Sequence, residues 1–473
     1  MNALPVLPVL LWTDALIWLL VAGVALVFWR ARRQPLVRAA FARVGQSRPG
    51  MAAATVLAAF IVVGLLDSLH YRPPLAGEPG QKIAYAVEVR SLLDALAEPL
   101  RARNEKTYSA PLATRAYAKE TIEVAGPDGR PVQQREFPRL RHGGKHLADE
   151  ADWAADVLRL AAFGLGAAAL IWCALAAGCV ARLARRSGTS LAVARRCLAC
   201  GETDFAWNAV LVTLAVLLAV FGPLLALSSG YHVFGTDKVG QSVFYQVLKS
   251  VRTGLVIGLV TTLVMLPLSV LLGVLAGYFR GWVDDVVQYL YTTLSSIPGV
   301  LLIAAAVLMM QVLIDTHPEW FTTAAERADL RLLALCVILG LSGWTGLARL
   351  LRGETLKLRE LEYIQAAQAF GVSDARILSR HILPNLMHLV IVALVMDFSG
   401  LVLAEAVLSY VGIGVDPTMI SFGTMINNAR MELAREPMVW WSLAAAFVFM
   451  FTLVLAANLL ADAVRDAFDP RRS

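Results

Sequence analysis

Two carboxylates stand within one of the most apolar stretches of this sequence, the run from Leu386 to Val411. Asp397 lies in the middle of the run and Glu405 lies nearer its end. A carboxylate at the centre of a membrane helix costs about 3 kcal/mol on insertion scales, so it usually serves a function there. Eight residues at about 100° each bring two side chains to about 80° apart, so both can face the interior of one helix bundle. This arrangement would suit a translocation pathway or gate.

Each carboxylate also has a structural alternative: it can snorkel to the membrane interface, or accept hydrogen bonds from backbone amides in a turn. This alternative suits Glu405 better than Asp397, because Gly412 and Gly414 follow Glu405 near the outer end of the run. Both interpretations stay open for Glu405, and the pathway interpretation is favoured for Asp397.

Other reactive patterns are sparse. Cys197 and Cys200 have the spacing of half a zinc site, but the sequence holds no second pair of this kind. The sequence contains no Gly-x-x-x-x-Gly-Lys-Ser/Thr phosphate loop and no evident Ser-His-Asp arrangement. We therefore expect this chain to bind no metal and no cofactor, to hold no ATP in the usual phosphate cradle, and to catalyse no reaction by itself.

A polar, helix-prone segment from Glu362 to Asn385 separates two strongly apolar stretches. Alanines at positions 366, 367 and 369 lie just before Gly371, which can end a first helix with a left-handed backbone. Ser373 can cap a second helix, which Pro384 is expected to stop. A short helix with an alanine face can approach a groove on a partner closely. Such a loop suits a part that transmits motion from a soluble motor to membrane helices.

This segment resembles the EAA loop of permease subunits in binding-protein-dependent ABC importers, which reads Glu-Ala-Ala, three residues, Gly, and a second half ending in Leu-Pro. Gln365 stands where the family motif has Glu, so it cannot make a salt bridge in place of that Glu. The resemblance implies that the loop couples the chain to ATPase subunits; the alternative is an ordinary amphipathic interface helix. The candidate coupling residues are Gln365, Ala366, Ala367, Gly371, Arg376, His381 and Pro384.

Further motifs resemble one branch of these permeases, the second membrane subunit of dipeptide, oligopeptide and nickel importers. Some positions depart from that branch: Gln241 and Ser242 replace an Arg-Asp pair, and Tyr289 and Thr292 replace an Arg and an Asp. The order of the motifs over about 270 residues nevertheless matches the branch. The matching segments are Phe234–Gly240, Ala276–Asp284 with Pro298, Trp344–Gly353, and Glu405–Gly414 with Pro417 and Ser421–Gly423.

The resemblance implies a non-catalytic subunit that forms half of a translocation pathway for small peptides, or alternatively for nickel or another small solute. It also implies several partners. These are a second permease subunit, two ATPase subunits that bind the ATP, an extracytoplasmic solute-binding protein and the lipid membrane.

Composition points to the membrane independently. Of the 473 residues, 58% are hydrophobic and 16% are charged, against about 25% charged residues in soluble proteins. The net charge of +6 fits basic residues gathered in membrane loops and does not indicate a nucleic-acid partner. Nine apolar runs approach the roughly 20 residues that a membrane helix needs. They are Ala15–Trp29, Met51–Leu66, Ala154–Val180, Ala209–Leu227, Thr253–Tyr278, Val283–Leu313, Leu332–Leu347, Leu386–Val411 and Val439–Leu460.

The distribution of basic residues predicts the orientation, because cytoplasmic loops carry an excess of Lys and Arg. No basic residue precedes Asp14, whereas the segment after the first run carries Arg30, Arg32, Arg33, Arg38, Arg43 and Arg48. This places the N-terminus outside, and alternation over nine spans places the 362–385 loop and the C-terminus in the cytoplasm. We therefore predict an all-α, multi-pass protein of the bacterial cytoplasmic (inner) membrane.

The chain divides near residue 200. Residues 201–473 hold six apolar runs and every family-like motif, and they predict a six-helix permease core with the coupling loop at 350–385. Residues 1–200 predict an extension with three further spans and an extracytoplasmic insert at 67–152. Within the insert, the spacing of apolar residues predicts a helix over Val87–Arg103. Whether the insert is a small cap domain or partly disordered is left open.

Two other classes of protein are compatible with this composition. A secondary transporter would need ionisable relays in several spans, and only Asp397 and Glu405 favour it. A membrane-anchored sensor or enzyme would carry its function in the insert, which lacks a recognisable catalytic cluster.

Overall fold

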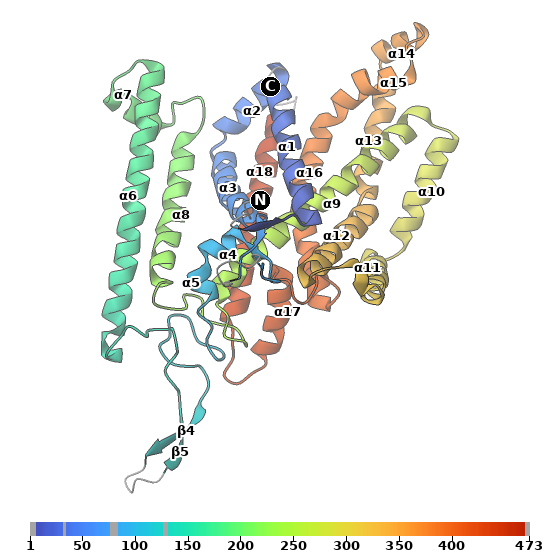
Figure 1. Cartoon of the computed structure of the whole chain (residues 1–473). Coiled ribbons are helices and arrows are strands. Elements are labelled where there is room, and N and C mark those ends of the chain that lie inside the picture. The colour runs from blue at the N-terminus through green and yellow to red at the C-terminus, as the bar shows by residue number, and fades with distance from the viewer. Residues whose placement is uncertain (1–5, 32–34, 76–83, 126–130, 469–473) are drawn as a thin grey trace.

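The structure is a computed structural model of the 473-residue chain, and it describes residues 6–31, 35–75, 84–125 and 131–468. Arg32 and Arg33, two of the basic residues behind the predicted orientation, lie outside these ranges. The described chain is mostly helical, and its long helices stand side by side as a bundle (Figure 1). This confirms the predicted all-α polytopic fold.

The extension contributes three long helices, two of which could each cross a membrane by length and composition. In the third, α1, the apolar part is shorter and covers Trp12–Leu26. The extension's helices are α1 (Trp12–Ala31), α2 (Pro35–Gln46), α3 (Arg48–Asp67), α6 (Trp153–Ser187) and α7 (Leu191–Cys200).

Six more segments of the described chain could cross a membrane, which brings the number of candidate spans to eight. They correspond to eight of the nine predicted runs, and α1 corresponds to the ninth. The core helices are α8 (Trp207–Leu227), α9 (Val243–Phe279), α10 (Trp282–Ser296), α11 (Gly299–Thr316), α12 (Ala324–Gly343), α13 (Thr345–Arg359), α16 (Leu383–Val411), α17 (Phe422–Leu433) and α18 (Trp441–Phe468).

The prediction of one helix over Val283–Leu313 is wrong. The helix breaks at Ile297, whose backbone is extended with φ −91° and ψ 130°, and α11 begins after Pro298. A residue before proline avoids the helical region, and proline lacks the amide hydrogen that continues the hydrogen-bond ladder. Two helices, α10 and α11, therefore take the place of the one predicted span.

Helix α9 lies at the centre of the core. Its first half is mostly buried, and clusters of buried apolar side chains join it to α12, to α13, and to α16 and α18. Two glycines permit close approach to α13: a Cβ on Gly273 would lie 2.5 Å from the Ala348 carbonyl oxygen, and one on Gly277 would lie 2.7 Å from that of Arg352. The backbones of α9 and α13 are therefore in direct contact.

Helices α6 and α8 form a pair at one side of the bundle (Figure 1). Gly164 and Gly222 allow this contact, because a Cβ on Gly164 would lie 2.5 Å from the Gly222 carbonyl oxygen. Helix α3 contacts α8 as well as α9 and α18. The extension is thus packed into the bundle, and a functional division near residue 200 stays a prediction.

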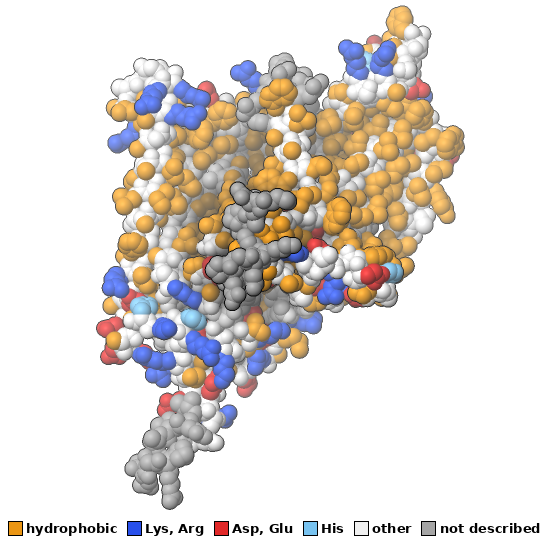
Figure 2. Space-filling view, viewed as in Figure 1, with side chains coloured by type: hydrophobic (Ala, Val, Ile, Leu, Met, Phe, Trp, Pro, Cys, Tyr) orange, Lys and Arg blue, Asp and Glu red, His pale blue; other side chains and the backbone are white. Residues whose placement is uncertain are grey.

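The two ends of the bundle differ. Figure 1 shows α2, α7 and the 362–385 loop at one end, which we call the loop end, and the insert and α17 at the other, which we call the insert end. Figure 2 shows a broad apolar band with most charged side chains gathered near the two ends. Charged side chains near both ends are expected if the spans cross the membrane alternately, because each loop between spans then lies at one end of the bundle. The assignment of the loop end to the cytoplasm stays a prediction.

The insert is built from short elements. The prediction of one helix over Val87–Arg103 is wrong, because Ser91 and Asp94 form a capping box that starts α4, and Pro99 lies in the first turn of a separate α5. The elements are β2 (His70–Arg72), which pairs antiparallel with β1 (Leu7–Val9) and β3 (Arg90–Ser91), then α4 (Leu92–Leu96), α5 (Glu98–Arg101), and the hairpin of β4 (Glu120–Ala125) and β5 (Pro131–Glu136).

Candidate functional site

The first half of the 362–385 loop has the predicted geometry. Helix α14 (Glu362–Ala369) ends just before Gly371, whose φ is +74°. The Val372 amide then donates a hydrogen bond to the Ala367 carbonyl at 3.1 Å. Bonds of this kind satisfy the last carbonyls of a helix when the residue after it is left-handed. The prediction that Gly371 ends the first helix is confirmed.

The second half of the loop starts differently from the prediction. Ser373 precedes α15 (Asp374–Ile377), but its side chain makes no capping hydrogen bond. The Asp374 carboxylate accepts a hydrogen bond from the Tyr278 hydroxyl of α9 at 2.6 Å. The start of this helix is therefore joined to the core by a side-chain contact.

The prediction that Pro384 stops the second helix is wrong. Pro384 lies in the first turn of α16, and the chain reaches α16 from α15 through a π-helical turn at Leu378–Ile382. In this turn, the Leu383 amide bonds to the Leu378 carbonyl, five residues back. The wider turn accommodates a proline that would clash in a regular helix interior.

The candidate coupling residues lie together on the projecting loop (Figure 1). Gln365, Ala366, Gly371, Arg376 and Pro384 are exposed, and Ala367 and His381 are half-buried. One further residue was missed: Phe370, at the tip, is 87% exposed and the most exposed large apolar side chain among the described residues. The sequence shows only that Phe370 stands directly before the helix-ending glycine, which does not by itself predict its exposure.

The base of the loop is packed onto the bundle. Ile364, Ile377 and Ile382 are fully buried in a cluster that also contains Leu351 of α13. Tyr278 joins both halves of the loop to α9, because its hydroxyl also accepts a hydrogen bond from Gln368 at 3.2 Å and its carbonyl accepts one from Arg359 at 2.6 Å. The loop is thus fixed at its base and exposed at its tip.

Asp397 lies in mid-helix on α16 and is half-buried. Within the described part of the chain, no side chain or amide makes a hydrogen bond or ion pair with its carboxylate. Its neighbours Met396, Gly400, Leu403 and Val407 recur at helical spacing and are all exposed. This gives α16 a continuous uncovered face with a carboxylate at its edge.

Glu405 has the opposite environment. It is 1% exposed and accepts hydrogen bonds from the Ser409 hydroxyl at 2.6 Å and the Ser421 hydroxyl at 2.8 Å. Ser421 in turn caps α17 through the Thr424 amide at 3.0 Å. These contacts favour the structural-turn alternative for Glu405. The two carboxylates share a helix but no common contact.

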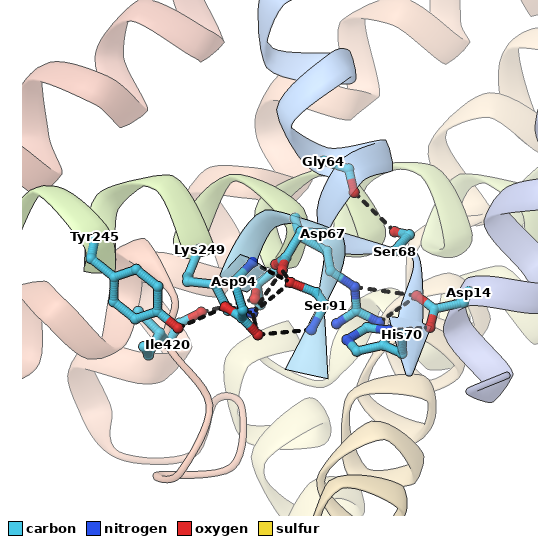
Figure 3. Close-up of polar contacts among 12 residues, drawn as sticks. Asp14, Gly64, Asp67, Ser68, His70, Ser91, Asp94, Tyr245, Lys249 and Ile420 are labelled. Atoms are coloured by element: carbon cyan, nitrogen blue, oxygen red, sulfur yellow. Dashed lines mark hydrogen bonds and ion pairs between the residues drawn. The ribbon is translucent and has the colours of Figure 1, made fainter. Parts of the chain in front are cut away.

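A buried ionic network that the sequence analysis missed joins the extension to the core. Arg252 of α9 is 5% exposed, and its guanidinium donates hydrogen bonds to Asp14 of α1 at 2.6 and 3.2 Å. It also lies 3.6 Å from Asp329 of α12, whose carboxylate accepts from the Thr13 amide at 3.0 Å. His70 Nδ1 lies 2.7 Å from Asp14 (Figure 3). Pairing offsets the large cost of burying these charges.

A second ionic cluster lies one helical turn away on α9. Lys249 Nζ lies 2.6 Å from Asp67, at the end of α3, and 3.1 Å from Asp94 of the insert (Figure 3). Asp94 also accepts from the Tyr245 hydroxyl at 2.7 Å, and Asp67 accepts from the Ser91 hydroxyl at 2.6 Å. Burial raises the pKa of Asp94, but the Lys249 charge and the hydrogen bonds from the Ser91 amide and the Tyr245 hydroxyl lower it more, so it lies below its usual value.

Glu105 fixes a further part of the insert to the core. Its side chain accepts hydrogen bonds from the amides of Arg141, His142 and Gly143 at 2.8 to 3.1 Å, and His232 Nε2 lies 3.2 Å away. Burial alone would raise the pKa of Glu105, but its contacts with His232 and the three amides outweigh burial and lower it to about 2. The insert is therefore folded against the core in its described residues.

Cys197 and Cys200 lie in α7. No group of three or more His, Cys, Asp or Glu side chains is placed to hold a metal ion in the residues that the structure describes.

Comparison with known proteins gives the same family as the motifs. The family described as "Binding-protein-dependent transport system inner membrane component" matches residues 269–473. The oligopeptide transport system permease protein OppC of Mycobacterium tuberculosis is 30% identical over 250 residues, which are 53% of this chain and 79% of the relative. The glutathione transport system permease protein GsiD of Pectobacterium atrosepticum is 34% identical over 245 residues, 51% of this chain and 74% of the relative. The chain belongs to the permease family of the binding-protein-dependent ABC importers, as a multi-pass membrane component.

Proposed function

We propose that this chain is the permease subunit of an ATP-driven importer of small peptides, and that it couples to ATPase subunits through the 362–385 loop. A second permease subunit would complete the pathway, two ATPase subunits would bind at the loop end, and a solute-binding protein would deliver the solute at the insert end. The observation that carries the proposal is the projecting helix–glycine–helix loop, rigid at its base and exposed at its tip.

The exposed surface of the loop has the chemistry of a protein interface. Phe370, after the end of α14, is 87% exposed, and Tyr363 and Leu361, at the start of α14, are 45% and 42% exposed. Arg376 and Arg380 of the same loop are also exposed and carry no ion pair within the described residues. An aromatic anchor with arginines around it is typical of residues that dominate binding energy at interfaces.

The uncovered face of α16 supports the second part of the proposal. Met396, Leu403 and Val407 need a partner surface or lipid, and Asp397 at their edge is unfavourable against lipid. A second permease subunit opposite this face would enclose a pathway in which Asp397 supplies one negative charge. The free amino group of a peptide would find there a partner of opposite charge.

The proposed cycle uses these parts in order. ATP binding would bring the ATPases together and move the loop tip, and the packed base would carry that displacement to α13, α16 and α9. The bundle would then open toward the insert end and accept solute. Each ligand shifts the equilibrium only by its differential affinity for the two conformations.

Reconstitution tests the proposal. The purified chain alone is expected to hydrolyse no ATP, and the chain assembled with its ATPase, second permease and binding-protein partners in liposomes is expected to hydrolyse ATP faster when the binding protein carries a peptide. Hydrolysis by the lone chain, free of contaminating ATPases, would overturn the proposal. If hydrolysis does not depend on peptide and another small solute accumulates in the liposomes, the permease assignment stands and the proposed substrate is wrong.

A further inference from the structure

A strongly basic surface lies at the loop end of α6 and α7. No Asp or Glu occurs between Asp156 and Glu202, so this region of both helices carries positive charge only. Five arginines lie at the loop end of this region; each is exposed, and none of the five has an ion pair or side-chain hydrogen bond among the described residues. We call this the α6–α7 basic surface; it consists of Arg182, Arg185, Arg186, Arg195 and Arg196.

Exposed apolar side chains lie beside these arginines. Ala194 and Leu198 hold α7 to its neighbours and are 1% and 6% exposed, whereas Leu191 and Val193 are 62% and 48% exposed. Leu191 and Arg195 are four residues apart, so they share one side of the helix. Helix α7 therefore has one anchored face and a free surface that is both apolar and basic.

The position of this surface completes the argument. Along α6, Leu170 and Ile171 are 74% and 50% exposed, as expected for side chains that face lipid. Figure 2 shows basic side chains gathered directly above the apolar band at this corner of the molecule, where Figure 1 places α7. Lipid headgroups lie at this level, because the apolar band of a spanning protein ends where the headgroups begin.

We propose that the α6–α7 basic surface binds the phosphate groups of anionic phospholipids, with Leu191 and Val193 inserted beside them. Arginine forks match phosphate oxygens in bidentate fashion, and clusters of basic residues next to a spanning helix attract anionic lipid. Because the α6–α8 pair stands at the side of the bundle, headgroup binding would fix it to the leaflet at the loop end.

The test uses the full-length chain in nanodiscs that contain phosphatidylcholine and phosphatidylglycerol. Native mass spectrometry after release into mild detergent counts the phosphatidylglycerol molecules retained by each chain. We expect the wild type to retain phosphatidylglycerol over phosphatidylcholine, with retention that falls as salt is raised. The variant with Arg185→Gln, Arg186→Gln, Arg195→Gln and Arg196→Gln should lose this preference about tenfold or more.

A matched control removes four positive charges from the insert end, with Lys119→Gln, Arg135→Gln, Arg141→Gln and Lys145→Gln, and should retain the lipid. Equal retention by the α6–α7 variant and the wild type would overturn the proposal. So would a variant that keeps the lipid but no longer binds the ATPase subunits, because the surface would then be a protein contact. If the variant does not fold, a second experiment uses a chain whose other cysteines are replaced and whose Cys200 carries a fluorophore. Brominated phosphatidylglycerol should quench this fluorophore more than brominated phosphatidylcholine does, and equal quenching would overturn the proposal.

Discussion

At the residue scale, Asp397 and Glu405 show how two carboxylates on one helix acquire different roles. Glu405 is enclosed by two serine hydroxyls and helps to start α17, so the hydrogen-bonding capacity of its carboxyl group is used inside the fold. Asp397 is half-buried without a partner in the described chain, so its carboxyl group is available to a partner from outside this chain. The sequence favoured the pathway for Asp397 but left both interpretations open for Glu405, because Ser421 approaches Glu405 from a different element.

The first prediction concerns Asp397. We expect Asp397→Asn to leave insertion and ATPase binding unchanged and to raise the apparent KM for peptides with a free amino terminus on the order of tenfold, since a charge-assisted hydrogen bond is worth about 1.5–3 kcal/mol. Uptake of labelled peptides, with and without an acetylated amino terminus, measures this. The control Asp462→Asn removes an exposed carboxylate from α18. Equal uptake by Asp397→Asn and wild type would remove Asp397 from the pathway.

The second prediction concerns Gly371. A Cβ on Gly371 would meet no atom within 4 Å, so Gly371→Val is strained only by the φ of +74°, at a cost of about 1–2 kcal/mol. We expect this variant to insert, to bind the ATPases more weakly and to transport more slowly. Gly353→Val is the matched control, because Gly353 is also in open space but lies within α13. Normal transport by Gly371→Val would contradict the role of the left-handed turn, whereas Gln365→Glu should be tolerated.

At the element scale, α9 is the helix that the extension and the core share. The third prediction is that Arg252→Met destabilises the chain by about 3–5 kcal/mol, because Asp14 and Asp329 are left buried without their cation. Thermal unfolding in detergent measures this loss. Adding Asp14→Asn and Asp329→Asn should recover part of it, and the exposed Lys357→Met should change little. An unaltered unfolding temperature for Arg252→Met would show that Arg252 does not form the buried ion pairs described above.

The fourth prediction is a pH dependence of the insert. The folded pKa of Glu105, about 2, lies below its ordinary value of 4.5, so its stabilising contribution is present above about pH 4.5 and is lost as pH falls toward 2. Thermal unfolding between pH 6 and pH 3 should therefore depend less on pH in Glu105→Gln than in the wild type. Glu120→Gln, which removes the partner of the exposed Lys106, should follow the wild type. Identical profiles for Glu105→Gln and wild type would refute the assignment.

Elements were predictable where one local signal dominates. Long apolar runs located the spans, and Gly371 located the end of α14, because a left-handed residue after a helix is a local requirement. The errors fell at prolines, whose effect depends on the turn in which they lie. Pro384 was expected to stop a helix, but a π-helical turn before it accommodates the ring, and Pro298 was expected to lie within a helix that it divides.

At the scale of the whole molecule, the contacts between extension and core could not be predicted. The sequence shows Asp14 and Asp67 at the ends of apolar runs and Lys249 and Arg252 at the start of another. It does not show which acid meets which base, because these partners are 182 to 238 positions apart. The network also changes how the extension should be tested. Deletion of residues 1–200 would remove Asp14 from the buried Arg252 and both acidic partners from the half-buried Lys249.

The β4–β5 hairpin offers a cleaner way to test whether the insert receives the solute-binding protein. It projects from the insert end (Figure 1) and contains none of the residues that pair with Lys249, Arg252 or His232. The Ala116 amide bonds to the Pro138 carbonyl at 2.8 Å, so the two ends of residues 118–137 lie close enough for a short linker.

The fifth prediction is that a chain with residues 118–137 replaced by such a linker folds and binds the ATPases like the wild type. Its hydrolysis should be stimulated less by loaded binding protein, and the stimulation should depend less on salt, because charged side chains that steer a partner act through screened interactions. ATPase assays over a range of salt, with wild type and a chain carrying Lys119→Gln and Arg135→Gln, measure both effects.

The charge variant should lose salt dependence but retain more stimulation than the deletion. Full stimulation by the deleted chain would place the docking surface elsewhere on the insert end, and loss of ATPase binding would show that the hairpin supports the core itself.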